Sequence, residues 1–148
     1  MAQVTARTER TIDAPARRVR AALADYENVR PAILTDHYRD YRVEAGGQGE
    51  GTRAHWLLQA TSKRVRDQLV EVSTPGDDRI VERDTNSSMV TTWTVTPAGA
   101  DRSVVAVESS WKGAGGIGGF FERTFAPKGL ARIHDALLER LERSVTAG

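Results

Sequence analysis

The stretch LARIHDALLERLERSV at residues 130–145 decides which fold the sequence predicts. Its apolar residues recur every three or four positions, at Leu130, Ile133, Ala136, Leu137, Leu141 and Val145, with Leu138 beside them. This spacing is typical of one face of an amphipathic helix. A helix of about 17 residues is about 25 Å long, which is enough to cross a small sheet. We therefore expect a long carboxy-terminal helix that packs on a sheet formed by the preceding chain.

The chain before this helix has the period of two that is typical of strands. Strands are predicted at about residues 3–12, 36–45, 52–60, 63–73, 79–85, 88–96 and 103–112. Two short helices are expected between the first two strands, one carrying Val19 and Leu23 and the other beginning near Pro31. Short turns join most of the strands, so the sheet should be antiparallel. The sequence predicts one α+β domain, residues 1–148, with a seven-stranded curved antiparallel sheet wrapped around the long helix.

Composition excludes several classes of function. The 148 residues contain 21 Lys and Arg against 20 Asp and Glu, with the two signs interspersed, so no nucleic-acid partner is expected. The chain has no cysteine, which removes disulfides, thiolate chemistry and cysteine-bound metals. No apolar run approaches the roughly 18 residues that span a bilayer, and the amino terminus lacks a signal-peptide core. We expect a cytoplasmic protein; its oligomeric state stays open.

Several segments resemble a known superfamily. They are residues 12–19 (IDAPARRV), Leu23, Asp25-Tyr26, Pro31, the strand start Gly51-Thr52-Arg53, and Trp111-Lys112-Gly113 before the glycine-rich loop. Together with the order of elements, they resemble the START-like helix-grip (SRPBCC) superfamily, and within it the polyketide cyclase/dehydrase and lipid-transport group. The resemblance covers nearly the whole chain and implies a cavity between sheet and helix. Its members include ligand carriers, cyclases, stress-response proteins and chaperone activators, so a shared fold leaves the function open.

The glycine-rich run GAGGIGG at residues 113–119 nominally matches a dinucleotide-binding fingerprint. Its neighbours are hairpin strands and not a parallel βαβ unit, so we interpret it as a flexible gate or a packing loop, and no cofactor is expected. Pro127 and Gly129 weaken the helix that follows. We expect a kink or break there, with residues 120–125 forming a separate lid-like turn.

A tight turn at Thr61-Ser62 predicts which side chains line the cavity. It sets Leu58 opposite Val65, Trp56 opposite Asp67 and Ala54 opposite Leu69, and directly opposed residues share a face. The apolar face should point inward and bring Asp67 with it as a hydrogen-bond anchor or general acid/base. The alternative is a register shifted by one residue, or an Asp67 at the exposed rim.

Other inward sets contain Trp93 with Met89, Thr91 and Val95, and Trp111 with Val105, Val107 and Ser109. The predicted ligand-binding residues are Trp56, Leu58, Asp67, Leu69, Trp93, Val107, Trp111, Phe121, Phe125, Leu130, Ile133, His134 and Leu137. Most of these side chains can equally be plain core. His37, His55 and His134 lack the spacing of metal ligands, so no metal site is expected.

Three functions remain open on this basis. The first is a carrier or sensor of a small hydrophobic molecule such as a lipid, polyketide or isoprenoid. The second is a polyketide cyclase, aromatase or dehydratase in which Asp67, with His134 or Tyr26, moves protons. The third is a protein-interaction module, which needs an exposed apolar patch.

Overall fold

The computed structural model describes residues 3–61, 64–113 and 116–146, without the side chains of residues 60, 61, 64 and 116–126. Its elements in chain order are β1 (Gln3–Ile12), α1 (Ala16–Ala24), α2 (Val29–Ile33), β2 (Tyr38–Ala45), β3 (Arg53–Thr61), β4 (Arg64–Gly76), β5 (Arg79–Asp84), β6 (Val90–Pro97), β7 (Ser103–Lys112) and α3 (Gly116–Thr146). This order confirms the predicted seven strands, two short helices and long final helix.

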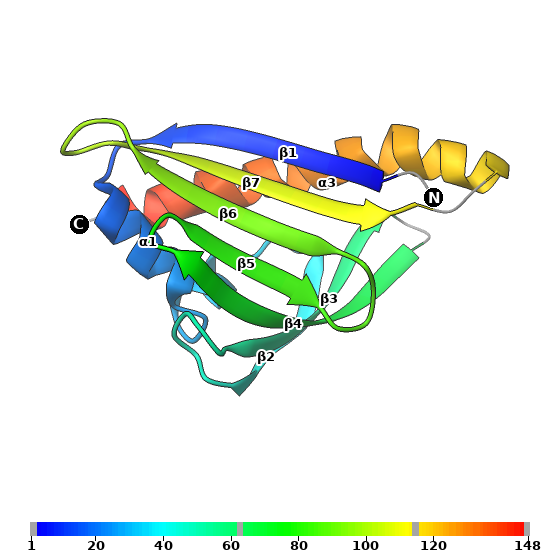
Figure 1. Ribbon diagram of the computed structural model, residues 1–148, viewed down its shortest axis with the longest axis horizontal. Helices are drawn as coiled ribbons and strands as arrows, with labels where there is room; N and C mark the ends of the chain where they lie inside the picture. Colours follow the sequence, from blue (N-terminus) through cyan, green and yellow to red (C-terminus); the bar gives the residue numbers. More distant parts are fainter. Residues whose placement is uncertain (1–2, 62–63, 114–115, 147–148) are drawn as a thin grey trace.

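The seven strands form one antiparallel sheet in the order β1-β7-β6-β5-β4-β3-β2. Hairpins join neighbours from β2 to β7, and β1 closes the far side by pairing with β7. The sheet curves, and α3 lies along its concave side with α1 near one end of the helix (Figure 1). The predicted helix-grip fold is therefore confirmed.

The core lies between the concave face of the sheet and the helices. Val19 and Leu23 of α1 and Leu138 and Leu141 of α3 are fully buried, as their helical spacing requires. In the strands the alternate residues are buried, for example Val105 and the other inward residues of β7. Complete burial of a Leu or Val side chain stabilises a fold by about 1.5–3 kcal/mol relative to exposure.

Polar contacts connect α3 to the first strand. The hydroxyl of Thr8 donates to the backbone oxygen of Ala131, and Arg10 of β1 pairs with Glu142 at 2.9 Å. These contacts orient the helix along β1, while its apolar face packs on the sheet.

Of the kink or break predicted near Pro127, the break is wrong, and a kink stays a prediction. α3 begins at Gly116 and continues through Pro127 and Gly129 to Thr146, so residues 120–125 belong to the helix and form no separate turn. Proline removes one backbone donor, but its φ near −65° matches that of a helix, so a long helix can include it. The glycine-rich loop is correspondingly shorter than predicted, and its residues 114–115 lie outside the described part of the chain.

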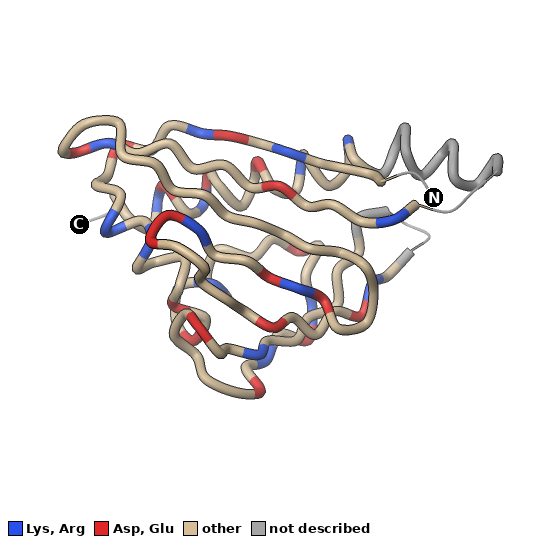
Figure 2. The backbone as a smooth tube through the Cα atoms, in the orientation of Figure 1, with Lys and Arg blue, Asp and Glu red and all other residues tan. Residues whose placement is uncertain are grey.

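Basic and acidic residues are interspersed along the described chain, with no long run of one sign (Figure 2). Within the described ranges, no helix has both the length and the hydropathy to cross a membrane.

Candidate functional site

A cavity opens between the concave face of the sheet and α3. Its lining combines residues of α2 and the segment after it, of β2 to β7, and of α3. They are Arg30, Leu34, Tyr38, Tyr41, Trp56, Leu58, Gln68, Glu82, Met89, Thr91, Trp93, Ser109, Leu130, His134 and Leu137. The cavity volume is about 30 Å³, counted as the space that the centres of water-sized molecules can occupy. That is room for about two water molecules.

Aromatic rings form much of one wall. The ring of Tyr41 lies parallel to that of Trp56, with 6.2 Å between ring centroids, and Tyr38 meets Trp56 edge-on at 6.1 Å. Leu130 and Leu137, one helical face of α3, form the opposite wall. The site is therefore narrow and flanked by flat rings, a lining suited to apolar and aromatic molecules.

A buried ion pair lies in the wall formed by β5 and β6. The Arg30 Nη2 atom is 2.7 Å from Glu82 Oε2, with both side chains almost fully buried. The Tyr26 hydroxyl donates to the same carboxylate oxygen at 2.5 Å, and the Trp93 indole donates to Oε1 at 3.1 Å. The Arg30 guanidinium also lies over the rings of Tyr26 and Trp93, at 4.5 and 4.9 Å from their centroids. Glu82 thus has a hydrogen-bond donor at each oxygen, as a buried carboxylate requires.

Burial and the ion pair shift the pKa values of this cluster. Burial alone would lower the pKa of Arg30, but the Glu82 carboxylate raises it above the ordinary value, so Arg30 stays charged. Burial also raises the pKa of Tyr26 well above its ordinary value, so its hydroxyl remains a donor. Burial raises the pKa of Tyr41 to about 12.

A second polar group projects from α3. His134 is 3% exposed, and its Nε2 lies 3.3 Å from the Ser109 hydroxyl, which in turn lies 2.6 Å from the hydroxyl of Thr91. Burial lowers the pKa of His134 to about 4, so the imidazole is neutral near pH 7. On the β3–β4 side, the Trp56 indole donates to Gln68 Oε1 at 2.7 Å, and the Gln68 amide reaches Met89 Sδ.

The predicted inward position of Asp67 is wrong. Trp56 lies opposite Gln68, and Asp67 lies opposite Leu57, one residue away from the predicted register. The hairpin closes with Thr61 opposite Arg64, and the ladder shifts by one residue between there and Leu58. A one-residue slip moves every side chain of a strand to the other face. For this reason β4 directs Gln68 and Val70 inward, and Asp67 outward.

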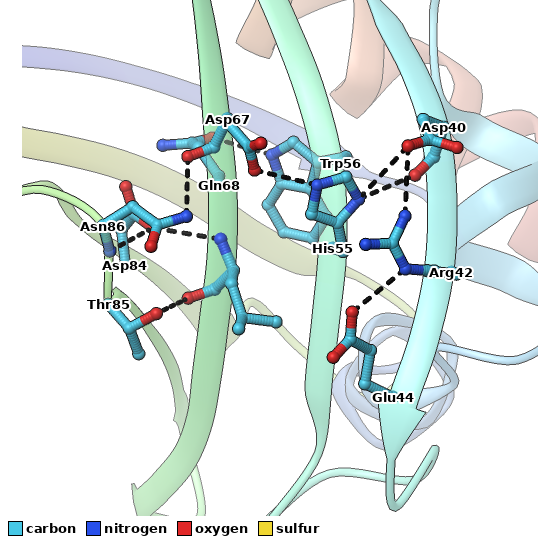
Figure 3. A network of polar contacts seen from close by, with 11 residues as sticks. Asp40, Arg42, Glu44, His55, Trp56, Asp67, Gln68, Asp84, Thr85 and Asn86 are labelled. Atoms are coloured by element: carbon cyan, nitrogen blue, oxygen red, sulfur yellow. Dashed lines mark hydrogen bonds and ion pairs between the residues drawn. The ribbon is translucent and has the colours of Figure 1, made fainter.

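The convex face instead holds Asp67 in a polar network (Figure 3). His55 Nε2 lies 2.8 Å from Asp67 Oδ1, and His55 Nδ1 lies 2.9 Å from the backbone oxygen of Asp40. The Asp67 side chain is 65% exposed, and its backbone oxygen accepts from the Asn86 amide. Figure 3 shows Trp56 and Gln68 turned to the other side of the strands. Asp67 is thus separated from the cavity by the sheet.

The predicted ligand-binding residues fall into four groups. Six line the cavity: Trp56, Leu58, Trp93, Leu130, His134 and Leu137. Three are buried in the core without lining it: Val107, Trp111 and Ile133. Two of β4, Asp67 and Leu69, point outward, as does Val65, which is 46% exposed. The side chains of Phe121 and Phe125 lie outside the described part. A role in binding stays a prediction for all of them except Asp67 and Leu69, which face away from the cavity.

Sequence reasoning missed the most polar part of the lining. Glu82 shares its strand parity with Ile80, so the alternation of β5 could have indicated that it points inward. Gln68 required the correct register of β4. Arg30 lies in the five-residue helix α2, which is too short to show a buried face in its spacing.

Comparison with known proteins agrees with this architecture. The profile of the family described as polyketide cyclase / dehydrase and lipid transport matches residues 3–146. No curated protein shows significant sequence similarity to the chain.

Solved structures share the fold. The chain is 51% identical to the KanY protein, whose solution structure it matches with a TM-score of 0.88, over 98% of this chain and 99% of that one. The Zhui aromatase/cyclase from Streptomyces sp. R1128 is 16% identical, with a TM-score of 0.73 and coverage of 99% and 98%. Truncated norcoclaurine synthase from Thalictrum flavum is 12% identical, with a TM-score of 0.73 and coverage of 99% and 96%. The last two similarities are similarities of fold.

Proposed function

Because the chain belongs to the polyketide cyclase/dehydrase and lipid transport family, we propose that it binds a small, mainly apolar molecule in the cavity between its sheet and α3. Lipid, polyketide and isoprenoid-like compounds are the candidate classes. The observation that carries the proposal is the composition of the lining, where aromatic and aliphatic walls surround a few buried polar groups. That combination is typical of small-molecule sites.

The size of the cavity requires that some side chains move when a ligand binds. A cavity of about 30 Å³ admits about two waters, so a larger molecule displaces part of the lining. Leu34, Tyr38 and Tyr41 are only partly buried and lie close together in the chain, after α2 and in β2. We place the access route at these three side chains.

The test uses a substitution in β6 that places a larger side chain in the cavity. Thr91 lines the cavity, whereas the next residue of β6, Thr92, projects from the opposite face of the sheet opposite Glu108. The probe is 5,6,7,8-tetrahydro-2-naphthol, whose binding quenches or shifts tryptophan fluorescence because Trp56 and Trp93 line the cavity. Thr91→Met should weaken binding by about tenfold, because the larger side chain occupies the site. Thr92→Met is the matched control and should leave the dissociation constant unchanged. Equal effects of the two variants, or no binding by the unchanged protein, would refute the proposal.

Native mass spectrometry of the gently purified protein then identifies the natural passenger. A stoichiometric apolar molecule that is absent from Thr91→Met and present in Thr92→Met supports a carrier or sensor.

A second function, cyclisation or dehydration of a polyketide-like chain, is favoured by one observation. His134 is neutral and lines the cavity, and a neutral imidazole can remove a proton from carbon between two carbonyl groups. Asp67 does not transfer protons in this enzymatic alternative, because it lies on the convex face of the sheet. His134→Gln should then stop turnover of a β-diketone probe while the tetrahydronaphthol still binds. Turnover that persists in this variant would remove the enzymatic alternative.

The third hypothesis, a protein-interaction module, stays a prediction. Within the described side chains, Val65 is the exposed large hydrophobic residue.

A further inference from the structure

Two buried side-chain nitrogen atoms in the described part of the chain have no hydrogen-bond partner, Arg30 Nε and His134 Nδ1. Both belong to residues that line the same cavity. Buried polar groups in folded proteins are nearly always paired, so each such exception calls for a missing partner. The coincidence of both exceptions at one cavity indicates that whatever occupies it completes their hydrogen bonding.

The unpaired atom of Arg30 specifies an acceptor. The guanidinium carries N–H donors and no acceptor. Its Nη1 donates to the backbone oxygen of Leu23 at 3.0 Å, and its Nη2 donates to Glu82. Of the three guanidinium nitrogens, only Nε has no partner, and because an N–H group can only donate, it requires an acceptor atom such as a carbonyl oxygen.

The unpaired atom of His134 is satisfied by a hydroxyl in either tautomer of the ring. The imidazole is neutral, so one of its nitrogens carries a proton and the other a lone pair. Nε2 meets the Ser109 hydroxyl, which can either donate or accept, so two tautomers satisfy that contact. Nδ1 is accordingly a donor in one tautomer and an acceptor in the other. A hydroxyl group both donates and accepts, and it satisfies Nδ1 in either case.

The charge of the lining favours an uncharged molecule. Arg30 and Glu82 are the charged residues among the described lining, and they neutralise each other at 2.7 Å. A ligand carboxylate near Arg30 would also lie near the Glu82 carboxylate, which would repel it, and would lose its hydration on burial. The flat rings of Tyr38, Tyr41 and Trp56 match a flat, ring-containing ligand.

From these observations we infer that the cavity takes an uncharged aromatic molecule with two oxygen functions, a carbonyl that accepts from Arg30 Nε–H and a hydroxyl that meets His134 Nδ1. This inference rests on the proposed ligand-binding function and adds to it the class of ligand.

The test compares four ligands on one bicyclic skeleton with the unchanged protein. They are tetralin with no oxygen, 1-tetralone with the carbonyl, 5,6,7,8-tetrahydro-2-naphthol with the hydroxyl, and 6-hydroxy-1-tetralone with both. Dissociation constants come from NMR titration, which also follows the ring nitrogens of His134. Each oxygen should tighten binding by several-fold, so that 6-hydroxy-1-tetralone binds at least about tenfold tighter than tetralin.

The ¹⁵N resonances of His134 should shift with the hydroxyl-bearing ligands and remain near their free positions with tetralin and 1-tetralone. A fifth ligand, 5,6,7,8-tetrahydro-2-naphthoate, should bind about tenfold more weakly than the tetrahydronaphthol, because it is charged.

His134→Phe separates the two contacts. Phenylalanine keeps a ring at this position but cannot form a hydrogen bond. In this variant the ligand hydroxyl should therefore no longer tighten binding, whereas the ligand carbonyl should still tighten it several-fold. The ligand series on the unchanged protein stands without this variant, so a failure of His134→Phe to fold does not remove the test.

Each outcome has a distinct meaning. If tetralin and the oxygenated compounds bind with equal strength, the inference about the ligand class is overturned, and water satisfies Arg30 Nε and His134 Nδ1 instead. The proposed binding function would still stand. Tighter binding of the naphthoate would overturn the uncharged class. Failure of all five ligands to bind would refute both.

Discussion

Arg30 and Glu82, 52 residues apart in the chain, form an ion pair of 2.7 Å in the wall of the cavity, with both side chains less than a tenth exposed. Removing one partner of such a pair leaves a buried charge without compensation. We expect Glu82→Gln to lower the free energy of unfolding by about 3–5 kcal/mol, as measured by urea denaturation followed by circular dichroism. The double variant Arg30→Met/Glu82→Gln should lose less than Glu82→Gln alone, because it removes the unpaired charge.

The control for this experiment is the exposed pair Arg143–Glu139 on α3. Glu139→Gln should change the stability by less than about 0.5 kcal/mol, because water screens exposed pairs. A cost below about 1 kcal/mol for Glu82→Gln would contradict the importance of the buried pair.

His134 should make the stability depend on pH. Burial lowers its folded-state pKa from 6.5 to about 4. As the pH falls below about 6.5, the unfolded chain therefore binds a proton at this residue before the folded protein does. Stability is thus fully present above pH 6.5 and decreases toward pH 4, by about 3 kcal/mol from this residue. The measurement is urea denaturation at pH 7 and pH 4.5 for the unchanged protein and for His134→Gln.

The carboxylates titrate in the same range, so the relevant quantity is the difference between the two proteins. Glu82 is the charged group that acts on His134, and it is present in both. His134→Gln should lose less stability between the two pH values than the unchanged protein. Parallel curves for the two proteins would mean that His134 does not stay neutral on folding.

Arg140 should control how fast ligands reach the cavity. Its Nη1 donates to the backbone oxygen of Leu34 at 2.8 Å, which joins α3 to the backbone of one residue of the proposed access route. Arg140→Ala should raise both the association and dissociation rates of 5,6,7,8-tetrahydro-2-naphthol by about two- to fivefold, because one hydrogen bond no longer opposes opening. The dissociation constant should change little, as the contact is outside the cavity. Stopped-flow fluorescence measures both rates.

Arg143→Ala is the matched control, since Arg143 lies one turn further along α3 and pairs with Glu139 and not with the α2–β2 segment. If the association and dissociation rates in Arg140→Ala are unchanged, ligands reach the cavity by another route.

Asp67→Asn should leave ligand binding intact. The carboxylate contacts His55 on the convex face and is 65% exposed, so the sheet separates it from the cavity. We expect an unchanged dissociation constant for the tetrahydronaphthol and a loss of stability below about 1 kcal/mol. Fluorescence titration and thermal unfolding give the two values. Loss of binding in this variant would place the ligand on the other face of the sheet.

Much of the fold could be predicted from neighbouring residues alone. The period of two across residues 103–112 matches β7, and the three-or-four spacing of Leu130, Leu137 and Leu141 matches the buried face of α3. The inward side chains of β3, β6 and β7 also followed from alternation, which is how Trp56 and Trp93 were identified.

The errors have specific physical causes. β4 was assigned to the wrong face because the β3–β4 ladder shifts by one residue between Thr61 and Leu58. The amino-terminal half of α3 was missed because glycine and proline oppose a helix in isolation, whereas the helix in this protein continues through Pro127.

Hydrophobic period and turn residues reside in short segments, so the amino-acid order alone was sufficient for the strands, most of the helices and the antiparallel sheet, whereas the cavity was expected from the family resemblance. The polar chemistry of that cavity depends on contacts between distant segments. Arg30 meets Glu82, and His134 meets Ser109, only when α2, β5, β7 and α3 converge. A local pattern carries no information on which polar groups will be buried together, because that depends on the register of the strands and the packing of the helices on them.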